Sequence, residues 1–153
     1  MSMTMIASEG RAVSGSRRGF LAGCFDPFPH PGVLRAMEQA TYACSLSGII
    51  VGLHIDPSLE RPEKAKNVMT IAERLVMLRA LRWVTGIHLY ERESDLLALL
   101  KSVKPDVRIM GEDYKGKTFT GDELEIPVFY ATRYPEWSAT EFKNRITASQ
   151  SVT

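Results

Sequence analysis

The sequence contains few cysteines, only Cys24 and Cys44 among its 153 residues. Two cysteines cannot form the disulfide framework of a small secreted domain, and these two lack the C-x-x-C spacing of a thiol redox site or a zinc site. We therefore expect both to be reduced thiols and the protein to be cytoplasmic, since thiols stay reduced in that compartment.

Long apolar runs are also missing. No segment approaches the ~18–20 apolar residues that a membrane-spanning helix requires. Glu9 and Arg11 interrupt the segment that follows residues 1–7, which excludes the apolar core of a secretory signal there. Charge of one sign is not in excess, because 19 Lys and Arg residues stand against 18 Asp and Glu residues, a net charge of +1. These absences exclude bulk binding to nucleic acid or to an anionic membrane, so any anion site must be local.

What is present is the composition of one globular domain, with 44% hydrophobic and 24% charged residues. Residues 1–18 show neither helical nor strand periodicity, and we predict that they form a mobile N-terminal extension. Residues 19–147 form the predicted domain, and residues 148–153 a C-terminal tail.

Short apolar runs alternate with helical patterns along this domain. Strands are predicted at five places: 19–24, 48–55, 86–90, 107–110 and 126–130. Helices are predicted at four: 32–46, 71–83, 95–103 and 141–146. Their N-terminal signals are a capping box of Thr70 and Glu73, and the caps Ser94 and Ser138. The alternation predicts one Rossmann-like α/β domain, with a five-stranded parallel sheet and helices on both faces.

In such a sheet, ligands bind outside the carboxyl ends of the strands. The first segment there runs from Gly23 to Val33 and reads G-C-F-D-P-F-P-H-P-G-V. A helix that opens near Gly32 presents free N–H groups and positive partial charge, which suit a phosphate, and His30 supplies a further donor. An ordinary strand–helix turn with a surface histidine fits these residue types equally well.

This loop resembles the signature of the nucleotidylyltransferase superfamily, a G-x-F-D strand end followed by H-x-G-H. The match is to the branch that contains glycerol-3-phosphate cytidylyltransferase and the heptose-phosphate adenylyltransferases, and it covers residues 19–146. Later segments support it in the expected order: Lys64-Ala65-Lys66, Glu73-Arg74, Met110 to Tyr114 followed by Lys115-Gly116-Lys117, and Arg133 followed by Trp137-Ser138-Ala139-Thr140.

The resemblance implies a role for each matching position. The residues expected to stabilise charge in catalysis are His30, Lys64, Lys66 and Arg133. Those expected to bind the nucleotide are Gly23, Cys24, Phe25, Asp26, Gly32, Arg74, Asp113, Ser138, Ala139 and Thr140. Mg²⁺ is expected to arrive with the nucleoside triphosphate and to bridge its phosphates, with no ligand set of the protein's own. The second substrate implied is a small phosphorylated acceptor, and the protein is expected to be a homodimer.

Structural explanations exist for several of these residues. Lys64 and Lys66 also fit a solvated charged loop, and Arg74 also fits a surface partner of glutamates one helical turn away. Ser138 and Glu141 form a capping box, which accounts for both, although a capped helix N-terminus remains a phosphate site. Asp113 also fits a turn.

Two departures from the family pattern concern the first loop. Three residues separate Asp26 from His30, where the family has two. The second histidine of H-x-G-H is replaced by Val33, which offers no hydrogen bond. A lost transition-state donor costs ~2.7–4 kcal/mol, or ~10²–10³ in rate, so we expect chemistry that is slowed rather than abolished. His54 is a candidate for the replacement donor.

Three hypotheses follow. The first is an enzyme that transfers a nucleotidyl group from CTP to an acceptor such as glycerol 3-phosphate and releases pyrophosphate, with ATP and a sugar phosphate as the alternative pair. The second, motivated by Val33, is a nucleotide-binding protein that has lost catalysis. The third is a fragment of a class I aminoacyl-tRNA synthetase, which also carries H-x-G-H. The absence of a K-M-S-K-S segment and of a basic tRNA-binding surface argues against it.

Overall fold

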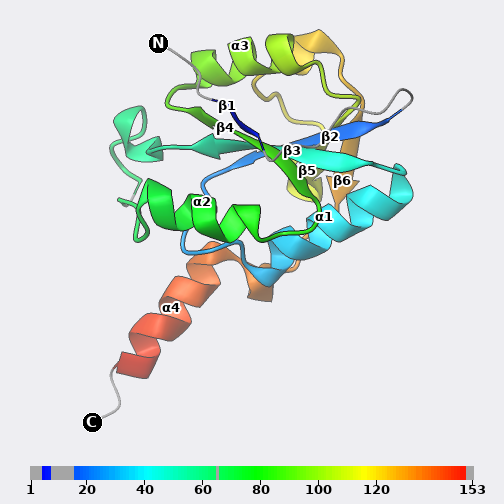
Figure 1. The fold of residues 1–153 in the computed structure, drawn as a ribbon. Helices are drawn as coiled ribbons and strands as arrows, with labels where there is room; N and C mark the ends of the chain where they lie inside the picture. Colours follow the sequence, from blue (N-terminus) through cyan, green and yellow to red (C-terminus); the bar gives the residue numbers. More distant parts are fainter. Residues whose placement is uncertain (1–4, 8–15, 65, 151–153) are drawn as a thin grey trace.

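The centre of the molecule is a six-stranded sheet in the order β1-β4-β3-β2-β5-β6 (Figure 1). The computed structural model describes residues 5–7, 16–64 and 66–150. Five strands are parallel: β2 (Arg18–Gly23), β3 (Gly48–His54), β4 (Val84–Tyr90), β5 (Val107–Gly111) and β6 (Val128–Ala131). The expected Rossmann-like α/β fold with a five-stranded parallel sheet is confirmed.

The sixth strand corrects the prediction for part of the N-terminal extension. β1 (Met5–Ala7) pairs antiparallel with β4, with Met5 opposite His88 and Ala7 opposite Gly86. The rest of the predicted extension, 1–4 and 8–15, lies outside the described residues. At the other end, the last helix continues through residues 148–150 of the predicted tail, and 151–153 lie outside the described part.

Helices cover both faces of the sheet, as its apolar strands require (Figure 1). β3 is buried at every position except His54. α1 (Pro31–Ala43) and α2 (Ile71–Arg79) pack against one face through Met37, Ala40 and Leu78. α3 (Glu93–Val103) covers the other through a separate cluster that includes Leu96, Leu99, Leu100 and Val103. Within the described residues, no helix combines the length and the apolar character needed to cross a bilayer.

Of the helix caps predicted from the sequence, that of α2 is present in the structure and that of α3 is not. Thr70 caps α2, because its hydroxyl accepts the N–H of Glu73 at 3.2 Å while Glu73 accepts the N–H of Thr70 at 2.9 Å. The prediction of Ser94 as the cap of α3 is wrong. That helix begins earlier, with Arg92 at the N-cap and Asp95 accepting the N–H of Arg92 at 3.0 Å. A carboxylate in the first turn is favourable at the positive end of a helix.

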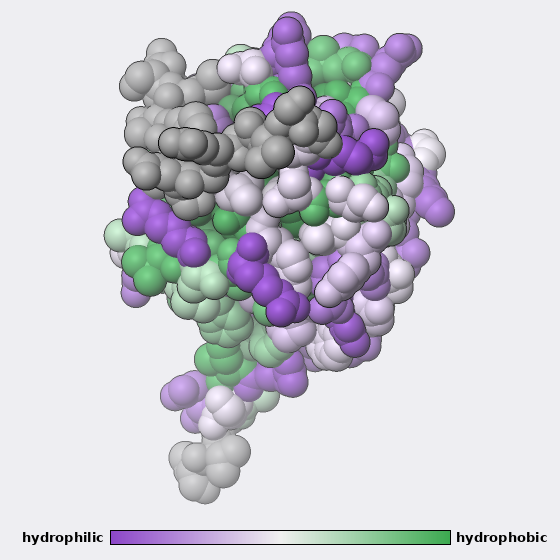
Figure 2. All heavy atoms as spheres, turned by 45° about the vertical axis from the view of Figure 1, so that its right-hand side comes forward, coloured by the Kyte–Doolittle hydropathy of each residue, from purple (hydrophilic) through white to green (hydrophobic). Residues whose placement is uncertain are grey.

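The last helix, α4 (Ala139–Gln150), stands out from the body of the molecule (Figures 1 and 2). Ser138 precedes it and accepts the N–H of Glu141 at 3.1 Å, as expected for its cap. The first turns of α4 rest on the loop after β2, where the Phe142 ring meets the rings of Phe28 and His30 at centroid distances of 6.0 and 6.5 Å. Four short 3₁₀ turns complete the fold: η1 (Pro57–Leu59), η2 (Glu112–Tyr114), η3 (Asp122–Leu124) and η4 (Pro135–Trp137).

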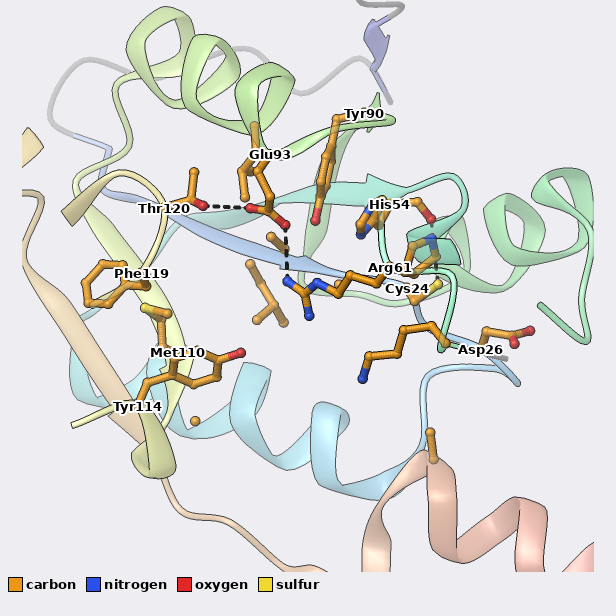
Figure 3. Close-up of a pocket in the computed structure, with 18 of the residues that line it drawn as sticks. Cys24, Asp26, His54, Arg61, Tyr90, Glu93, Met110, Tyr114, Phe119 and Thr120 are labelled. Carbon is orange, nitrogen blue, oxygen red and sulfur yellow. Dashed lines mark hydrogen bonds and ion pairs between the residues drawn. The ribbon is translucent and has the colours of Figure 1, made fainter. Parts of the chain in front are cut away.

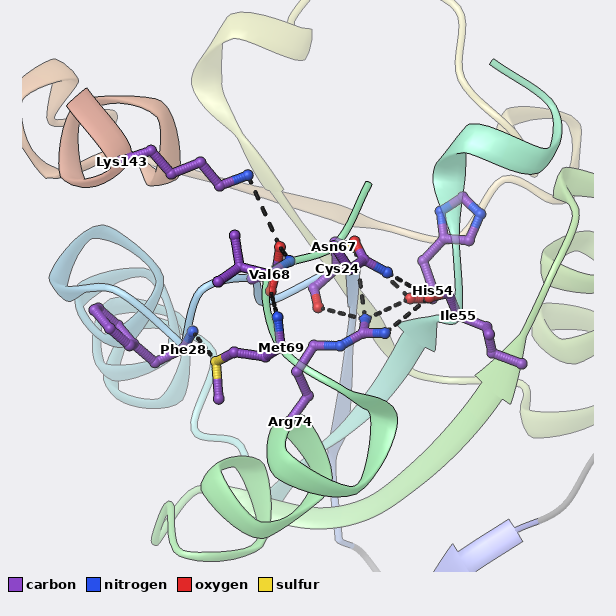
Figure 4. Close-up of polar contacts among 10 residues, drawn as sticks. Cys24, Phe28, His54, Ile55, Asn67, Val68, Met69, Arg74 and Lys143 are labelled. Atoms are coloured by element: carbon purple, nitrogen blue, oxygen red, sulfur yellow. Dashed lines mark hydrogen bonds and ion pairs between the residues drawn. The ribbon is translucent and has the colours of Figure 1, made fainter. Parts of the chain in front are cut away.

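Arg74 of α2 is an interior residue, with 1% of its surface exposed. Its guanidinium donates to three carbonyls at the ends of β2 and β3, those of Cys24 (3.0 Å), His54 (2.8 Å) and Ile55 (2.8 Å) (Figure 4). The structure therefore corrects both the predicted nucleotide contact and the alternative of a surface partner. Arg74 instead ties α2 to the carboxyl ends of two strands, since Cys24 and Ile55 directly follow β2 and β3 and His54 is the last residue of β3.

We expect Arg74→Met to lower the free energy of unfolding by about 3 kcal/mol, since a buried carbonyl left without a donor costs ~1–3 kcal/mol and the carbonyls of Cys24 and His54 lose the guanidinium. The Ile55 carbonyl keeps a second donor, the side-chain amide of Asn67 at 2.7 Å. Urea denaturation followed by circular dichroism measures the change. Arg79→Met, at an exposed position of the same helix, is the matched control and should stay within ~0.5 kcal/mol of the wild type. Equal stability of the two variants would contradict the structural role of Arg74.

Candidate functional site

Two adjoining cavities lie at the carboxyl ends of β2 and β5. These strands are the point where the strand order reverses, which is where ligands bind in open α/β sheets. The larger cavity has a volume of about 860 Å³ and the smaller one about 270 Å³. They share four lining residues: Leu21, Ile109, Met110 and Gly111. The two cavities are therefore neighbours at this end of the sheet.

The smaller cavity is built around the N-terminus of α1. His30, Gly32 and Val33 line it together with Trp137 and Ser138. Gly32 permits this arrangement, because a Cβ there would lie 2.5 Å from the carbonyl oxygen of Trp137. Any larger residue would push α1 away from η4, so Gly32 holds the two segments together as walls of one site.

His30 is the N-cap residue of α1, but its side chain does not cap the helix. Its Nδ1 is buried and makes no hydrogen bond to the described residues. Burial lowers the pKa of His30, so its imidazole is neutral at pH 7. His30 therefore offers the cavity a hydrogen bond rather than a positive charge.

Val33 lines the same cavity and packs against the hydrophobic core beneath it. His54, considered above as a replacement donor, lines the larger cavity instead. Its ring stacks on Tyr90 at 4.6 Å, and its Nε2–H donates a hydrogen bond to the carbonyl oxygen of Glu91 at 3.0 Å. The structure thus gives Val33 no substitute in His54.

Arg133, predicted to stabilise charge, and Asp113, predicted to bind the nucleotide, both line the smaller cavity. The Arg133 guanidinium donates to Asp113 at 2.7 Å, and its backbone N–H donates to Glu112 at 3.1 Å. The Arg133 side chain is 54% exposed, so this ion pair leaves the guanidinium accessible to an anion.

The G-x-F-D segment is divided between the cavity and the core. Gly23, Cys24 and Asp26 line the larger cavity. Phe25, predicted to contact the nucleotide, is buried in the hydrophobic core and lines neither cavity. The Cys24 Sγ lies 3.1 Å from Asn67 Oδ1, and burial raises the pKa of this thiol, so it stays protonated.

Asp26 fixes the loop that carries the predicted lysines. Its carboxylate accepts the backbone N–H groups of Val68 at 2.9 Å and Met69 at 2.7 Å. The structure brings Lys64 to the lining of the larger cavity, whereas Lys66 is exposed and lines neither cavity. Only one of the two lysines is therefore placed at the site.

The N-terminus of α4 lies between the cavities. Ser138 lines the smaller one, while Ala139 and Thr140 line the larger one. Lys143, one helical turn after Ala139, also lines the larger cavity. Sequence analysis missed Lys143, although its spacing of four from Ala139 places both on one face of a helix.

The far end of the larger cavity was also missed. The Glu93 carboxylate accepts the hydroxyl of Thr120 at 2.7 Å and lies 3.7 Å from the Arg61 guanidinium (Figure 3). Arg108, buried beside them, donates to the carbonyl of Thr120, and burial lowers its pKa. Burial raises the pKa of Tyr90, which stays a neutral phenol. This end offers both donors and acceptors of hydrogen bonds.

The arrangement of the His, Cys, Asp and Glu side chains bears on how a divalent cation would be held at this site. In the part of the chain that the structure describes, no three His, Cys, Asp or Glu side chains come together as a metal site. The carboxylate of Asp26, which lines the larger cavity, already accepts two backbone N–H groups and lies 3.8 Å from Lys143. A divalent cation at this site would therefore draw its ligands chiefly from a bound phosphate and water.

Comparison with known proteins gives the relatives of the chain. It is 36% identical over 116 residues to bifunctional protein HldE of Acidiphilium cryptum, covering 75% of this chain and 23% of that protein. It is 33% identical over 117 residues to HldE of Caulobacter vibrioides, covering 76% and 23%. The chain thus spans less than a quarter of these curated relatives.

A solved structure agrees with the fold. The lipopolysaccharide core biosynthesis protein of Thermoplasma volcanium superposes with a TM-score of 0.57 at 20% identity, covering 77% of this chain and 96% of that one. The family described as cytidylyltransferase-like matches residues 20–145, which include both cavities' strands, the loop after β2 and the start of α4. On its sequence and its fold together, the chain belongs to the cytidylyltransferase-like family.

Proposed function

We propose that the protein is a nucleotidyltransferase that moves a nucleotidyl group from CTP, or from ATP as the alternative donor, to a sugar phosphate and releases pyrophosphate. The observation that carries this proposal is the pair of joined cavities at the ends of β2 and β5. Transfer between two substrates needs two adjacent sites, and the N-terminus of α4 borders both. Membership of the cytidylyltransferase-like family supports the same reaction class.

The smaller cavity, of about 270 Å³, suits one part of the nucleotide, and the rest extends toward the larger cavity. It combines apolar side chains, including Val33 and Trp137, with the paired Arg133 and Asp113. His30 and the first turn of α1 supply hydrogen-bond donors for phosphate oxygens. The triphosphate then reaches the junction of the cavities beside Ser138.

The larger cavity, of about 860 Å³, suits the acceptor. Lys64 and Lys143 among its lining residues provide charge for the acceptor phosphate. Glu93, Thr120 and Arg61 provide donors and acceptors of hydrogen bonds. Such groups suit the several hydroxyls of a sugar better than the two of glycerol 3-phosphate, so we propose a sugar phosphate.

The chemistry requires positioning more than proton transfer. An oxygen of the acceptor phosphate forms a bond to the α-phosphorus, and the bond from that phosphorus to the α–β bridging oxygen breaks, so pyrophosphate leaves with the electron pair. The acceptor phosphate is already anionic, so no general base is needed. Neutral His30 donates a hydrogen bond, while Lys64 and Arg133 offset charge. The Mg²⁺ that accompanies the triphosphate neutralises further charge on the phosphate oxygens.

We expect the protein to release pyrophosphate from CTP or ATP in the presence of Mg²⁺ and a sugar phosphate, and Val33→His to raise kcat by ~10²–10³ because it restores a donor at the phosphates. A coupled pyrophosphate assay with a panel of sugar phosphates and glycerol 3-phosphate measures both. Val33→Leu, which alters size without adding a donor, is the matched control.

Turnover in the Val33→His variant alone, with nucleotide binding in both proteins, would favour the second hypothesis of a binding protein that has lost catalysis. Neither turnover nor nucleotide binding in either protein would contradict the proposed function.

The acceptor assignment makes its own prediction. Glu93→Gln should raise the KM for the sugar phosphate about tenfold, because a charged acceptor of the sugar's hydroxyls contributes ~1.5–3 kcal/mol. The KM for the nucleotide should change less than twofold, since Glu93 lines only the larger cavity. Steady-state kinetics with each substrate varied separately tests this, with Glu123→Gln, exposed and outside both cavities, as the control. An equal effect on both KM values would argue against the assignment.

A further inference from the structure

The junction between the cavities, where their shared residues Leu21, Ile109, Met110 and Gly111 lie, is a place where two negatively charged groups would repel each other. If the proposed function holds, the acceptor phosphate must approach the α-phosphate of the nucleotide, and both are anions. His30 is neutral and Val33 is apolar, so the start of α1 contributes no side-chain charge. Cations must therefore reach the junction from other elements.

The cations at the far end of the larger cavity are already engaged. Arg108 is buried, donates to Thr120 and lies over the Phe119 ring at 5.1 Å. Arg61 lies 3.7 Å from the carboxylate of Glu93. Both belong to the hydrogen-bonding end of the cavity rather than to the end where α4 begins.

Lys143 is placed at the α4 end. It extends from α4 toward the loop after β2, and its Nζ lies 3.8 Å from Asp26 Oδ2 (Figure 4). It lines the larger cavity with Thr140 and Lys64. The adjacent Phe142 contacts the rings of Phe28 and His30, so the turn that carries Lys143 is held against this loop.

The contact with Asp26 positions the ammonium group without saturating it. Both oxygens of the Asp26 carboxylate accept backbone N–H groups, and the side chain is only 2% exposed. The 3.8 Å separation from Lys143 exceeds the ~2.7–3.2 Å of a hydrogen bond. The Lys143 side chain itself is 38% exposed. An ammonium carries three donors, so Lys143 keeps donors for a ligand in the cavity. The Asp26 carboxylate meanwhile holds the positive charge of Lys143 near the end of β2.

We infer that Lys143 is a catalytic residue that binds the phosphate of the acceptor and reduces its repulsion with the α-phosphate. This inference rests on the proposed function. Lys143 transfers no proton and forms no covalent bond: the acceptor oxygen bonds to the α-phosphorus, and pyrophosphate departs with the electrons of the broken bond. Asp26 is then a positioning residue, because it acts on the substrates through Lys143.

The test is steady-state kinetics of Lys143→Met and Lys143→Arg, with Lys101→Met at an exposed position of α3 as the matched control. Lys143→Met should lower kcat/KM for the sugar phosphate about 10- to 100-fold, the loss of one charge-assisted hydrogen bond, and change the KM for the nucleotide less than twofold. Lys143→Arg should recover part of the loss, and Lys101→Met should behave as the wild type. Thermal denaturation checks that all the variants are folded.

A second measurement uses inorganic phosphate as a competitor of the acceptor. Its inhibition constant should rise about tenfold in Lys143→Met, which a purely structural role of Lys143 would not produce. An unchanged kcat/KM for the acceptor, or equal losses for both substrates, overturns the role of Lys143 and leaves the proposed function intact. If the wild type shows no turnover with any acceptor, the proposed function itself fails. Calorimetry of inorganic phosphate binding to the wild type and Lys143→Met then decides the Lys143 site alone, and equal binding overturns it.

Discussion

The buried guanidinium of Arg74 holds together the strand ends that form part of the larger cavity. Parallel strands end with carbonyls that the sheet itself does not pair, and such groups are costly when buried. Arg74 satisfies three of them at once, at Cys24, His54 and Ile55. It thereby fixes the ends of β2 and β3 relative to α2. Three residues at these two strand ends line the larger cavity: Cys24 and Asp26 just after β2, and His54 at the end of β3.

The overall fold was predictable because its signals are local. Strands buried on both faces read as continuous apolar runs, and the helices between them carry periodic patterns and caps. Two errors have physical causes. The N-cap of α3 is Arg92 rather than Ser94, because the Asp95 carboxylate accepts the backbone N–H of Arg92 and the helix therefore begins two residues earlier. The pairing of Met5–Ala7 with β4 depends on a contact across more than 70 positions of the chain, which no local pattern reports.

The site was predictable in part, again because some of its residues lie in segments with a recognisable local pattern. Segments with a recognisable motif supplied His30, Gly32, Arg133 and Ser138, and the structure brings these four to one cavity. Burial, however, depends on tertiary packing. Phe25 turned into the core, and Arg74 is buried against strand-end carbonyls, although both fell inside matching segments. The Glu93–Thr120 contact joins residues that carry no motif.

The short strand β1 has a consequence for how the protein behaves among other chains. β4 is seven residues long, and an unpaired edge of that length presents a row of N–H and C=O groups to which a strand from another molecule can add. With Met5–Ala7 in place, the outermost strand on that side is three residues long, and a short edge is a poor template for further pairing. β1 thus shortens the exposed edge of the sheet, which disfavours edge-to-edge pairing with another molecule.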